Sequence, residues 1–324
     1  MSLISGRGSR AQVGIETTWG SPVNTTAQVG FVSESLKRVL NYKQEDILLG
    51  RKTTGPMDVL GDKIEGDLVI IPHPDTCGEL LAAHFGAEAT VTGSGSAYVH
   101  SLTHVAAGAG ASLPKMTIMV DRIVRVFRFT SCKSDSLKLS ASVGDYLRAT
   151  FTIRGRGEGS SALLSLSDSA LKGFKFHQGT ISIGGSAFAT VTDFNLTDAN
   201  QLDNDLYAMD GSTQMIEIEP NDRQTTGDME ILYDSATEAL RAATFIAGTP
   251  QSVVLTFTSD EEVGGTDPYK LIITMNNVYF TDIPPMVEGA TRMKVRMNFQ
   301  ASEQSGTEAI TLALHNARST KYLA

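Results

Sequence analysis

The sequence predicts a mainly β fold of two tandem antiparallel β-sandwich or β-barrel domains, each with a flanking α-helix. Three observations support this: the alternation of apolar and polar residues, the scarcity of helical patterns, and the repetition of one ordered set of motifs. The chain of 324 residues is long enough for two domains that each bury a core. Its 41% hydrophobic and 19% charged residues are typical of a globular protein, and exclude a disordered chain or a membrane bundle.

Period-two alternation marks the predicted strands. It is clearest between Leu147 and Arg154 and between Met293 and Phe299, where every second residue is apolar. Such a strand buries one face and exposes the other, as in an antiparallel sheet. Further strands are predicted at Met116–Val120, Val124–Phe129, Ser136–Ser140, Thr180–Ile183, Phe188–Leu196, Val253–Thr258, Leu271–Met275 and Ile310–Leu314.

Two helices are predicted from capping boxes, the S/T-x-x-E pattern that satisfies the first free amides of a helix. The first box pairs Thr76 with Glu79, and the second pairs Ser235 with Glu238. Glycines that follow, Gly86 and Gly248, predict where the helices end.

The motifs around these helices occur twice in the same order. Gly66-Asp67 and Gly227-Asp228 precede the two helices, and strands ending in a strongly alternating one follow each of them. This order indicates an internal duplication. The boundary is predicted in the glycine-rich stretch 154–161, which gives one domain over 1–160 and another over 161–324.

Each predicted domain carries an extension. The first has an N-terminal arm and a long loop at 41–64, and the second has a C-terminal arm. A long structureless loop in a compact domain usually has a function.

Composition excludes several classes of protein. The two cysteines, Cys77 and Cys132, exclude a disulfide framework, and no Cys/His set has the spacing of a structural zinc site. A net charge of −9 disfavours tight binding to a phosphate backbone. The longest apolar runs, such as Leu68–Ile71, are too short to span a bilayer, and Met1–Arg10 lacks the apolar stretch of a signal peptide. We therefore expect a protein made and kept in a cytoplasm.

No pattern in the sequence predicts an enzyme, a cofactor or a metal site. His100 and His104 have the spacing of a helical metal pair, but no Glu follows the first and the flanking Gly, Ser and Ala residues disfavour a helix. The carboxylates of Asp203, Asp205 and Asp210 lack the glycine and terminal Glu of a calcium loop. A nucleophile elbow, G-x-S-x-G, does not occur.

Taken together, five segments resemble a known family. They are Arg10–Pro22, Phe31–Leu36, Gly66-Asp67, Phe299–Glu303 and Ile310–Asn316. The chain resembles the tail tube (major tail) proteins of long-tailed, non-contractile bacteriophages, in the class with two tube-like domains. The resemblance implies a β-sandwich or barrel with a flanking helix, a role in assembly, and no catalytic site.

The resemblance also implies partners and a location. Six tube domains would surround each lumen, so a duplicated chain implies rings of three subunits with pseudo-sixfold symmetry. The rings would stack into a tube in the virion tail of a siphophage, after self-assembly in the host cytoplasm. The partners would be further copies of the chain and the tape measure, tail terminator and distal tail proteins, with DNA passing through the lumen during ejection without specific binding.

Candidate contact residues between subunits lie in the loop and in the N-terminal arm. We expect the loop 41–64 to stack rings through its apolar residues Ile47, Leu48, Leu49, Met57 and Val59, so that Leu48→Asp or Leu49→Asp folds but does not polymerise. The alternative is a surface flap that packs these residues against itself. Trp19 is expected either on a neighbouring subunit or in the core of its own domain.

Charge patterning suggests a lumen wall. Residues 193–234 hold eleven carboxylates and one base, and an acidic wall would let DNA slide. Asp198, Asp203, Asp205 and Asp210 are the candidates, with an ordinary solvated face as the alternative. Bases on the alternating strands are expected to pair with such carboxylates across subunits; they are Arg148, Arg154, Lys294 and Arg296.

Two other functions remain open from the sequence. One is a two-domain β-sandwich that binds carbohydrate or mediates adhesion, although one Trp and eight scattered Tyr give little aromatic platform. The other is a tube protein whose second half decorates the outside, which would place six chains in each ring.

Overall fold

The computed structural model describes residues 5–47, 50, 53–106, 108, 112–203, 205–265, 267–283 and 292–323. Up to residue 160, which we call the first half, the elements are η1 (Gly6–Gly8), β1 (Arg10–Glu16), β2 (Ala27–Val29), β3 (Phe31–Glu34), β4 (Lys37–Gln44), β5 (Met57–Ile70), α1 (Gly78–Phe85), β6 (Gly86–Glu88), β7 (Thr92–Ser94), β8 (Ala97–His104), β9 (Lys115–Asp121), β10 (Val126–Ser142), β11 (Arg148–Gly155) and β12 (Gly157–Ser160).

The second half, residues 161–324, is equally rich in strands. Its elements are η2 (Phe176–Gln178), β13 (Gly179–Ile183), β14 (Ser186–Ala187), β15 (Val191–Ala199), β16 (Leu202–Asp203), β17 (Glu219–Pro220), β18 (Gln224–Leu232), α2 (Ser235–Arg241), η3 (Ala242–Ile246), β19 (Gln251–Val263), β20 (Asp267–Asp282), β21 (Lys294–Ala301) and β22 (Ile310–Asn316). The predicted mainly β fold with large antiparallel sheets is confirmed.

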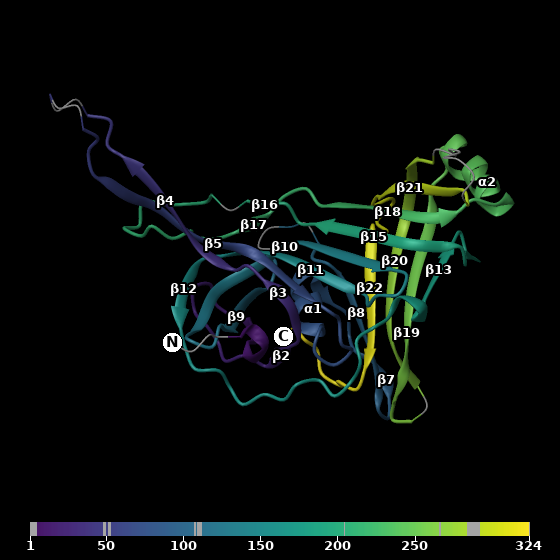
Figure 1. Ribbon diagram of the computed structural model, residues 1–324, viewed down its shortest axis with the longest axis horizontal. Helices are drawn as coiled ribbons and strands as arrows, with labels where there is room; N and C mark the ends of the chain where they lie inside the picture. The colour runs from purple at the N-terminus through teal and green to yellow at the C-terminus, as the bar shows by residue number, and fades with distance from the viewer. Residues whose placement is uncertain are drawn as a thin grey trace.

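One wide antiparallel sheet runs through both halves in the order β4–β5–β11–β10–β15–β18–β21–β20 (Figure 1). Two further layers cover its apolar face: β2–β1–β9–β10–β12 in the first half, and β14–β13–β19–β20–β22–β8 around the second. The long strands β10 and β20 each belong to two layers, because different parts of each strand pair with different neighbours. A single core cluster therefore extends across both halves.

The two helices differ in burial. All eight residues of α1 are buried between the layers of the first half, whereas in α2 only Thr237 is buried. Gly86 ends α1 in the left-handed conformation, at φ 89°, as the sequence predicted. The predicted Thr76 capping box is wrong, because Cys77 is the N-cap and makes no side-chain cap bond.

Other local predictions also need correction. In α2 the cap is Asp234, whose carboxylate accepts from the Thr237 amide, rather than Ser235. Glu79 is buried and pairs with Arg318, with Oε1 2.7 Å from Nη1. At the start of α2, the carboxylate of Asp234, one position before the predicted cap Ser235, therefore accepts the free amide in place of the serine hydroxyl.

The predicted loop at 41–64 is in fact mostly a hairpin, since β4 and β5 pair as far as Gln44 with Met57. The glycine-rich stretch 154–161 is not a linker, because Gly157–Ser160 forms β12 and pairs with β10. The predicted strand Val124–Phe129, from Val126 on, and the predicted strand Ser136–Ser140 are parts of the single strand β10.

Gly66 and Gly227 occupy matching places where neighbouring backbone leaves no room for a side chain. A Cβ on Gly66 would lie 2.5 Å from the carbonyl oxygen of Ser35, and Gly66 has φ 149°. A Cβ on Gly227 would meet the carbonyl oxygen of Asn195 and the ring of Phe299. The repeated Gly-Asp motif therefore has a steric cause in both halves.

We expect Gly66→Ala to lower the free energy of unfolding by about 1–3 kcal/mol, because the methyl group overlaps backbone atoms that cannot move away independently. Urea denaturation followed by circular dichroism measures this. Gly50→Ala is the comparison variant, and we expect it to lower the free energy of unfolding by less. A Cβ there would meet nothing within 4 Å, so only the strain of its positive φ remains. An unchanged midpoint for Gly66→Ala would contradict the steric argument.

Candidate assembly surfaces

Seven strand pairings of the first half recur in the second. Around the long strands, β9–β10 matches β19–β20, and β10–β11 matches β20–β21. In the same way β10–β12 matches β20–β22, and β1–β9 matches β13–β19. The other three are β1–β2, which matches β13–β14, β5–β11, which matches β18–β21, and β3–β5, which matches β15–β18. The hairpins of β8 with β6 and β7 occur only in the first half among the described residues.

The register irregularities also recur. β3 has a bulge between Phe31 and Ser33, and β15 has one between Val191 and Asp193. When Gly66 is aligned with Gly227, these two bulges fall at the same place. A second pair of bulges, at Ser134/Ser136 in β10 and at Phe280/Asp282 in β20, coincides in the same way. Coinciding bulges are not expected of two unrelated sheets.

The two halves join where β15 pairs with the C-terminal part of β10, from Ser136 opposite Ala199 to Ser142 opposite Asp193. The corresponding edges at the two ends of the sheet have no such partner in the described part of the chain. After Val278, β20 pairs only with β21, and β3 and β4 pair only with β5. Unpaired strand edges are open to pairing with another chain.

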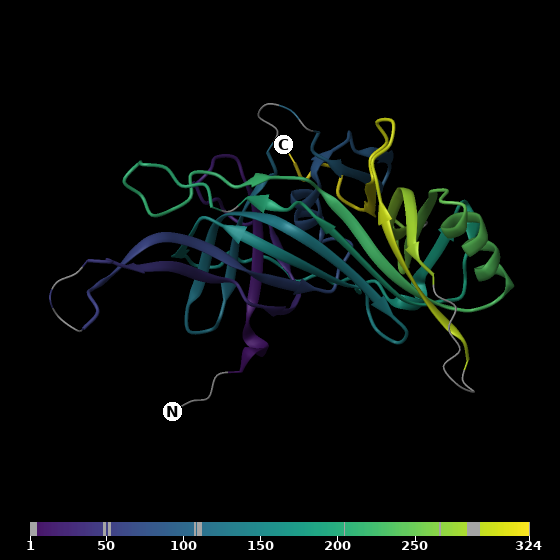
Figure 2. The same cartoon turned by 90° about the horizontal axis from the view of Figure 1, so that it is seen from above.

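Two arms project from the same end of the molecule (Figures 1 and 2). The first arm is the end of the β4–β5 hairpin, with residues 41–47, 50 and 53–63 described, and the second arm is residues 200–223, described except at 204, between β15 and β18. They lie side by side, because the Asp62 amide donates to the Thr213 carbonyl at 2.8 Å and Lys63 Nζ lies 3.4 Å from Asp205 Oδ1. The second arm connects β15 to β18 in the second half, just as the hairpin turn connects β4 to β5 in the first half.

Both arms expose apolar side chains. On the first arm Ile47, Met57 and Leu60 are 55%, 61% and 56% exposed, and Val59 is half-buried. On the second, Met209 is fully exposed. Leu48 and Leu49 lie outside the described residues.

The opposite end of the second half holds an apolar cavity of about 270 Å³. It opens between β15 and the β13–β19 layer, and Phe176, Ile181, Phe188 and Leu255 are among the residues that line it. Ala141, near the end of β10, contributes to its wall. The arms and this cavity therefore lie at opposite ends of the central strands.

The polar face of the wide sheet is rich in ion pairs. The charged residues on β5 (from Glu65), β11, β10, β15, β18 and β21 that point away from the core are five bases, Arg148, Arg154, Lys138, Lys294 and Arg296, and six carboxylates, Glu65, Asp67, Asp135, Asp193, Asp228 and Glu230. The two signs are thus nearly equal in number on this face.

The four bases expected to pair across subunits have carboxylate partners within the chain. Arg154 Nη1 lies 3.2 Å from Glu65 Oε2, and Lys294 Nζ lies 2.6 Å from Glu230 Oε1. Arg296 pairs with Asp228. Arg148 pairs with Asp145 in the preceding turn. For Lys294 and Arg296 the partner carboxylates within the chain lie in residues 193–234, on the adjacent strand of the same sheet.

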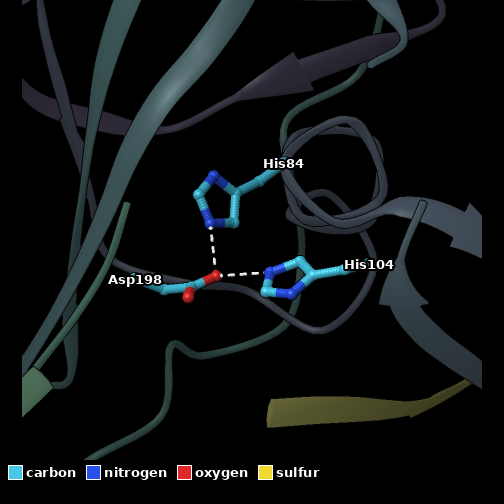
Figure 3. Close-up of side chains that lie close together, drawn as sticks. All are labelled: His84, His104 and Asp198. Atoms are coloured by element: carbon cyan, nitrogen blue, oxygen red, sulfur yellow. Dashed lines mark hydrogen bonds and ion pairs between the residues drawn. The ribbon is translucent and has the colours of Figure 1, made fainter. Parts of the chain in front are cut away.

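The four candidate lumen carboxylates are in two different environments. Asp203, Asp205 and Asp210 are exposed on the second arm. Asp198 is only 1% exposed, so its assignment to a lumen wall is wrong. It points into the joint between the halves, where it accepts hydrogen bonds from His84 and His104 (Figure 3). It also accepts one from Thr225.

Trp19 has a partner in its own chain. Its ring is half-buried and lies 5.4 Å, centroid to Nζ, from Lys133, a buried lysine that also donates to Glu217 and to the Ile218 carbonyl. Burial lowers the pKa of Lys133, and Glu217 opposes that shift.

A β-sheet protein with projecting arms and unpaired strand edges is typical of chains that associate through their strands. Over residues 6–301 the chain matches the family model described as phage tail tube protein. It therefore belongs to the phage tail tube protein family, and it is a structural component of a phage tail. It matches none of the curated proteins with which it was compared.

Among the helices that the structure describes, none has both the length and the apolar character to cross a membrane.

Proposed function

We propose that the chain consists of two tube-forming units, residues 1–160 and 161–324, and that three chains close into a ring of six units around a channel. The observation that supports this most directly is the β10–β15 joint inside the chain. It joins the end of one unit to the start of the next, and among the described residues the same two kinds of edge are left unpaired at the two ends of the sheet. Repeating the joint between chains pairs every such edge, and closure removes the free edges.

The duplication fixes a register for the joint between chains. Matching the β5–β11 pairing to the β18–β21 pairing aligns Asp67 with Asp228. In this alignment Asp282 of β20 is equivalent to Ser136 of β10. Val39 of β4 is likewise equivalent to Ala199 of β15. Ser136 lies opposite Ala199 within the chain. In the ring, Asp282 of one chain then lies opposite Val39 of the next.

Rings stack head to tail in this proposal. The arms of one ring reach the opposite face of the next, where the cavity lined by Phe176, Ile181 and Phe188 receives their apolar side chains. Identical rings stacked in one direction always bring these two ends together. Asp203, Asp205 and Asp210 then form an acidic rim at the contact between rings, and Trp19 stays within its own subunit.

The polar face of the wide sheet lines the channel. Its five bases and six carboxylates are nearly equal in number, and most are paired to one another. Bases already paired with carboxylates release few counterions on meeting phosphate, so DNA gains little by binding and passes through. The tape measure, tail terminator and distal tail proteins are the further partners of the finished tube, which forms in the host cytoplasm and serves DNA ejection from a siphophage virion.

Electron microscopy of concentrated purified protein tests this proposal. We expect hollow filaments built of stacked rings. A protein that remains monomeric at the highest concentrations would contradict self-assembly and favour a binding or adhesion module. Filaments with six chains in each ring would instead favour a second half that decorates the outside.

A further inference from the structure

A buried cluster of two histidines and one carboxylate lies at the joint between the halves (Figure 3). His84 comes from the end of α1, His104 from the end of β8 and Asp198 from β15. Their side chains are at most 4% exposed. Asp198 Oδ2 lies 2.9 Å from His84 Nε2 and 2.8 Å from His104 Nε2, and the three potential ligand atoms lie within 4.8 Å of one another.

Outer contacts hold two of these side chains in orientation. Ser134 Oγ lies 2.8 Å from His84 Nδ1, the ring nitrogen that faces away from Asp198. Thr225 Oγ1 donates to Asp198 Oδ1 at 2.6 Å, which leaves Oδ2 for the histidines. Hydrogen bonds of this kind fix the tautomer and direction of metal ligands in proteins.

The charge of the cluster favours a cation. Among the described residues, no Lys or Arg side chain forms an ion pair with Asp198. The guanidinium of Arg223 is the nearby positive charge, and it donates to the Val105 carbonyl instead.

The spacing of the donor atoms fits a metal ion. In an octahedral complex with bonds of about 2.1 Å, neighbouring donors lie about 3.0 Å apart. The two Nε2–Oδ2 distances are close to this spacing, and the three ligand atoms lie within 4.8 Å of one another, so the two imidazole rings would turn toward a shared ion to complete the site. Imidazole and carboxylate together suit zinc, cobalt and nickel better than calcium or magnesium.

A route for the ion is also present. A polar cavity of about 1000 Å³ adjoins the cluster, with His104 and Thr225 in its wall. Five carboxylates line the same cavity and would raise the local concentration of cations; they are Glu217, Glu219, Asp222, Glu303 and Glu308. Water in this cavity can supply the remaining ligands.

We propose that His84, His104 and Asp198 form a binding site for one divalent transition-metal ion, of the zinc, cobalt and nickel group, at the joint between the two halves. Each histidine binds the ion through Nε2 as the neutral Nδ1–H tautomer, so a proton held on Nε2 moves to Nδ1 by exchange with solvent, while the carboxylate stays ionised. Because α1 and β8 belong to the first half and β15 to the second, the bound metal ties the halves together. This site stands independently of the assembly proposed above.

The test uses the untagged full-length chain. After dialysis against Zn²⁺ and removal of free metal by gel filtration, we expect about one ion per chain by mass spectrometry. Co²⁺ in place of Zn²⁺ should give visible d–d absorption that saturates at the same stoichiometry. A wild-type chain that retains no zinc and gives no cobalt spectrum would overturn the site, whatever the variants do.

Variants then assign the ligands. His104→Gln and Asp198→Asn are each expected to weaken binding by at least tenfold, whereas His177→Gln, on an exposed histidine, should bind as the wild type does. Circular dichroism checks that each variant is folded. If a ligand variant does not fold, the cobalt spectrum of the wild type still decides the question. Equal loss in His177→Gln, or no loss in a folded His104→Gln, would also overturn the assignment.

Discussion

Chains carrying Val39→Cys together with Asp282→Cys are expected to become covalently joined to their neighbours when tubes are oxidised. The register transferred from the β10–β15 joint places these two positions opposite each other across the contact between chains. Cross-strand pairs bring Cβ atoms to about 4.5–5.5 Å, close to the spacing that a disulfide requires. On a non-reducing gel the ladder of products should end at three chains, because a closed trimeric ring has no fourth neighbour.

The matched control is the pair Ser136→Cys and Ala199→Cys, which lie opposite each other within one chain. It should form its disulfide without any change in the number of chains. The native cysteines, Cys77 and Cys132, are buried and should not interfere. Oxidised tubes of the Val39/Asp282 pair that yield only single chains would rule out the proposed register, and a ladder reaching six would rule out a ring of three.

Met57→Asp combined with Leu60→Asp is expected to abolish tubes while leaving the fold intact. Both side chains are more than half exposed on the first arm, so the free chain should tolerate the change. In the stack they enter an apolar environment, where each contributes about 1.5–3 kcal/mol, and losing both raises the concentration needed for assembly by at least about a hundredfold. Sedimentation and negative-stain microscopy over a concentration series measure this.

Ala189→Asp, in the wall of the cavity that is proposed to receive the arm, should have a similar effect. Ser252→Asp, at an exposed position on β19, should assemble as the wild type does. Normal tubes from the arm variant would show that stacking does not depend on the first arm. If only Ala189→Asp formed normal tubes, stacking would still depend on the first arm, but this cavity would not be the surface that receives it.

Much of the fold could be predicted because the alternation of the strands is local information. In β11 and β21 every second residue faces the core, exactly as period two requires. The repeated Gly-Asp motif is also visible in the sequence, although the backbone that requires glycine at Gly66 and Gly227 is distant along the chain, at Ser35 and Asn195. The first arm was mistaken for a loop because both faces of β4 are largely solvent-exposed, so its residues have no apolar alternation.

The candidate sites depended on contacts between distant residues, which no local pattern in the sequence indicates. Asp198 was assigned to a lumen because it lies among carboxylates, yet His84 and His104, each more than ninety positions away, hold it in the core. His84 was not singled out at all, since a lone histidine in an apolar helix carries no spacing signal. The partners of Lys294 and Arg296 became evident only from the pairing of β21 with β18.

Electron cryomicroscopy of the assembled tube tests the central claim most directly. The account predicts rings of three chains, with six similar β units around the channel and alternate joints formed within and between chains. A ring of six chains, in which only one half of each chain reaches the channel wall, would contradict it.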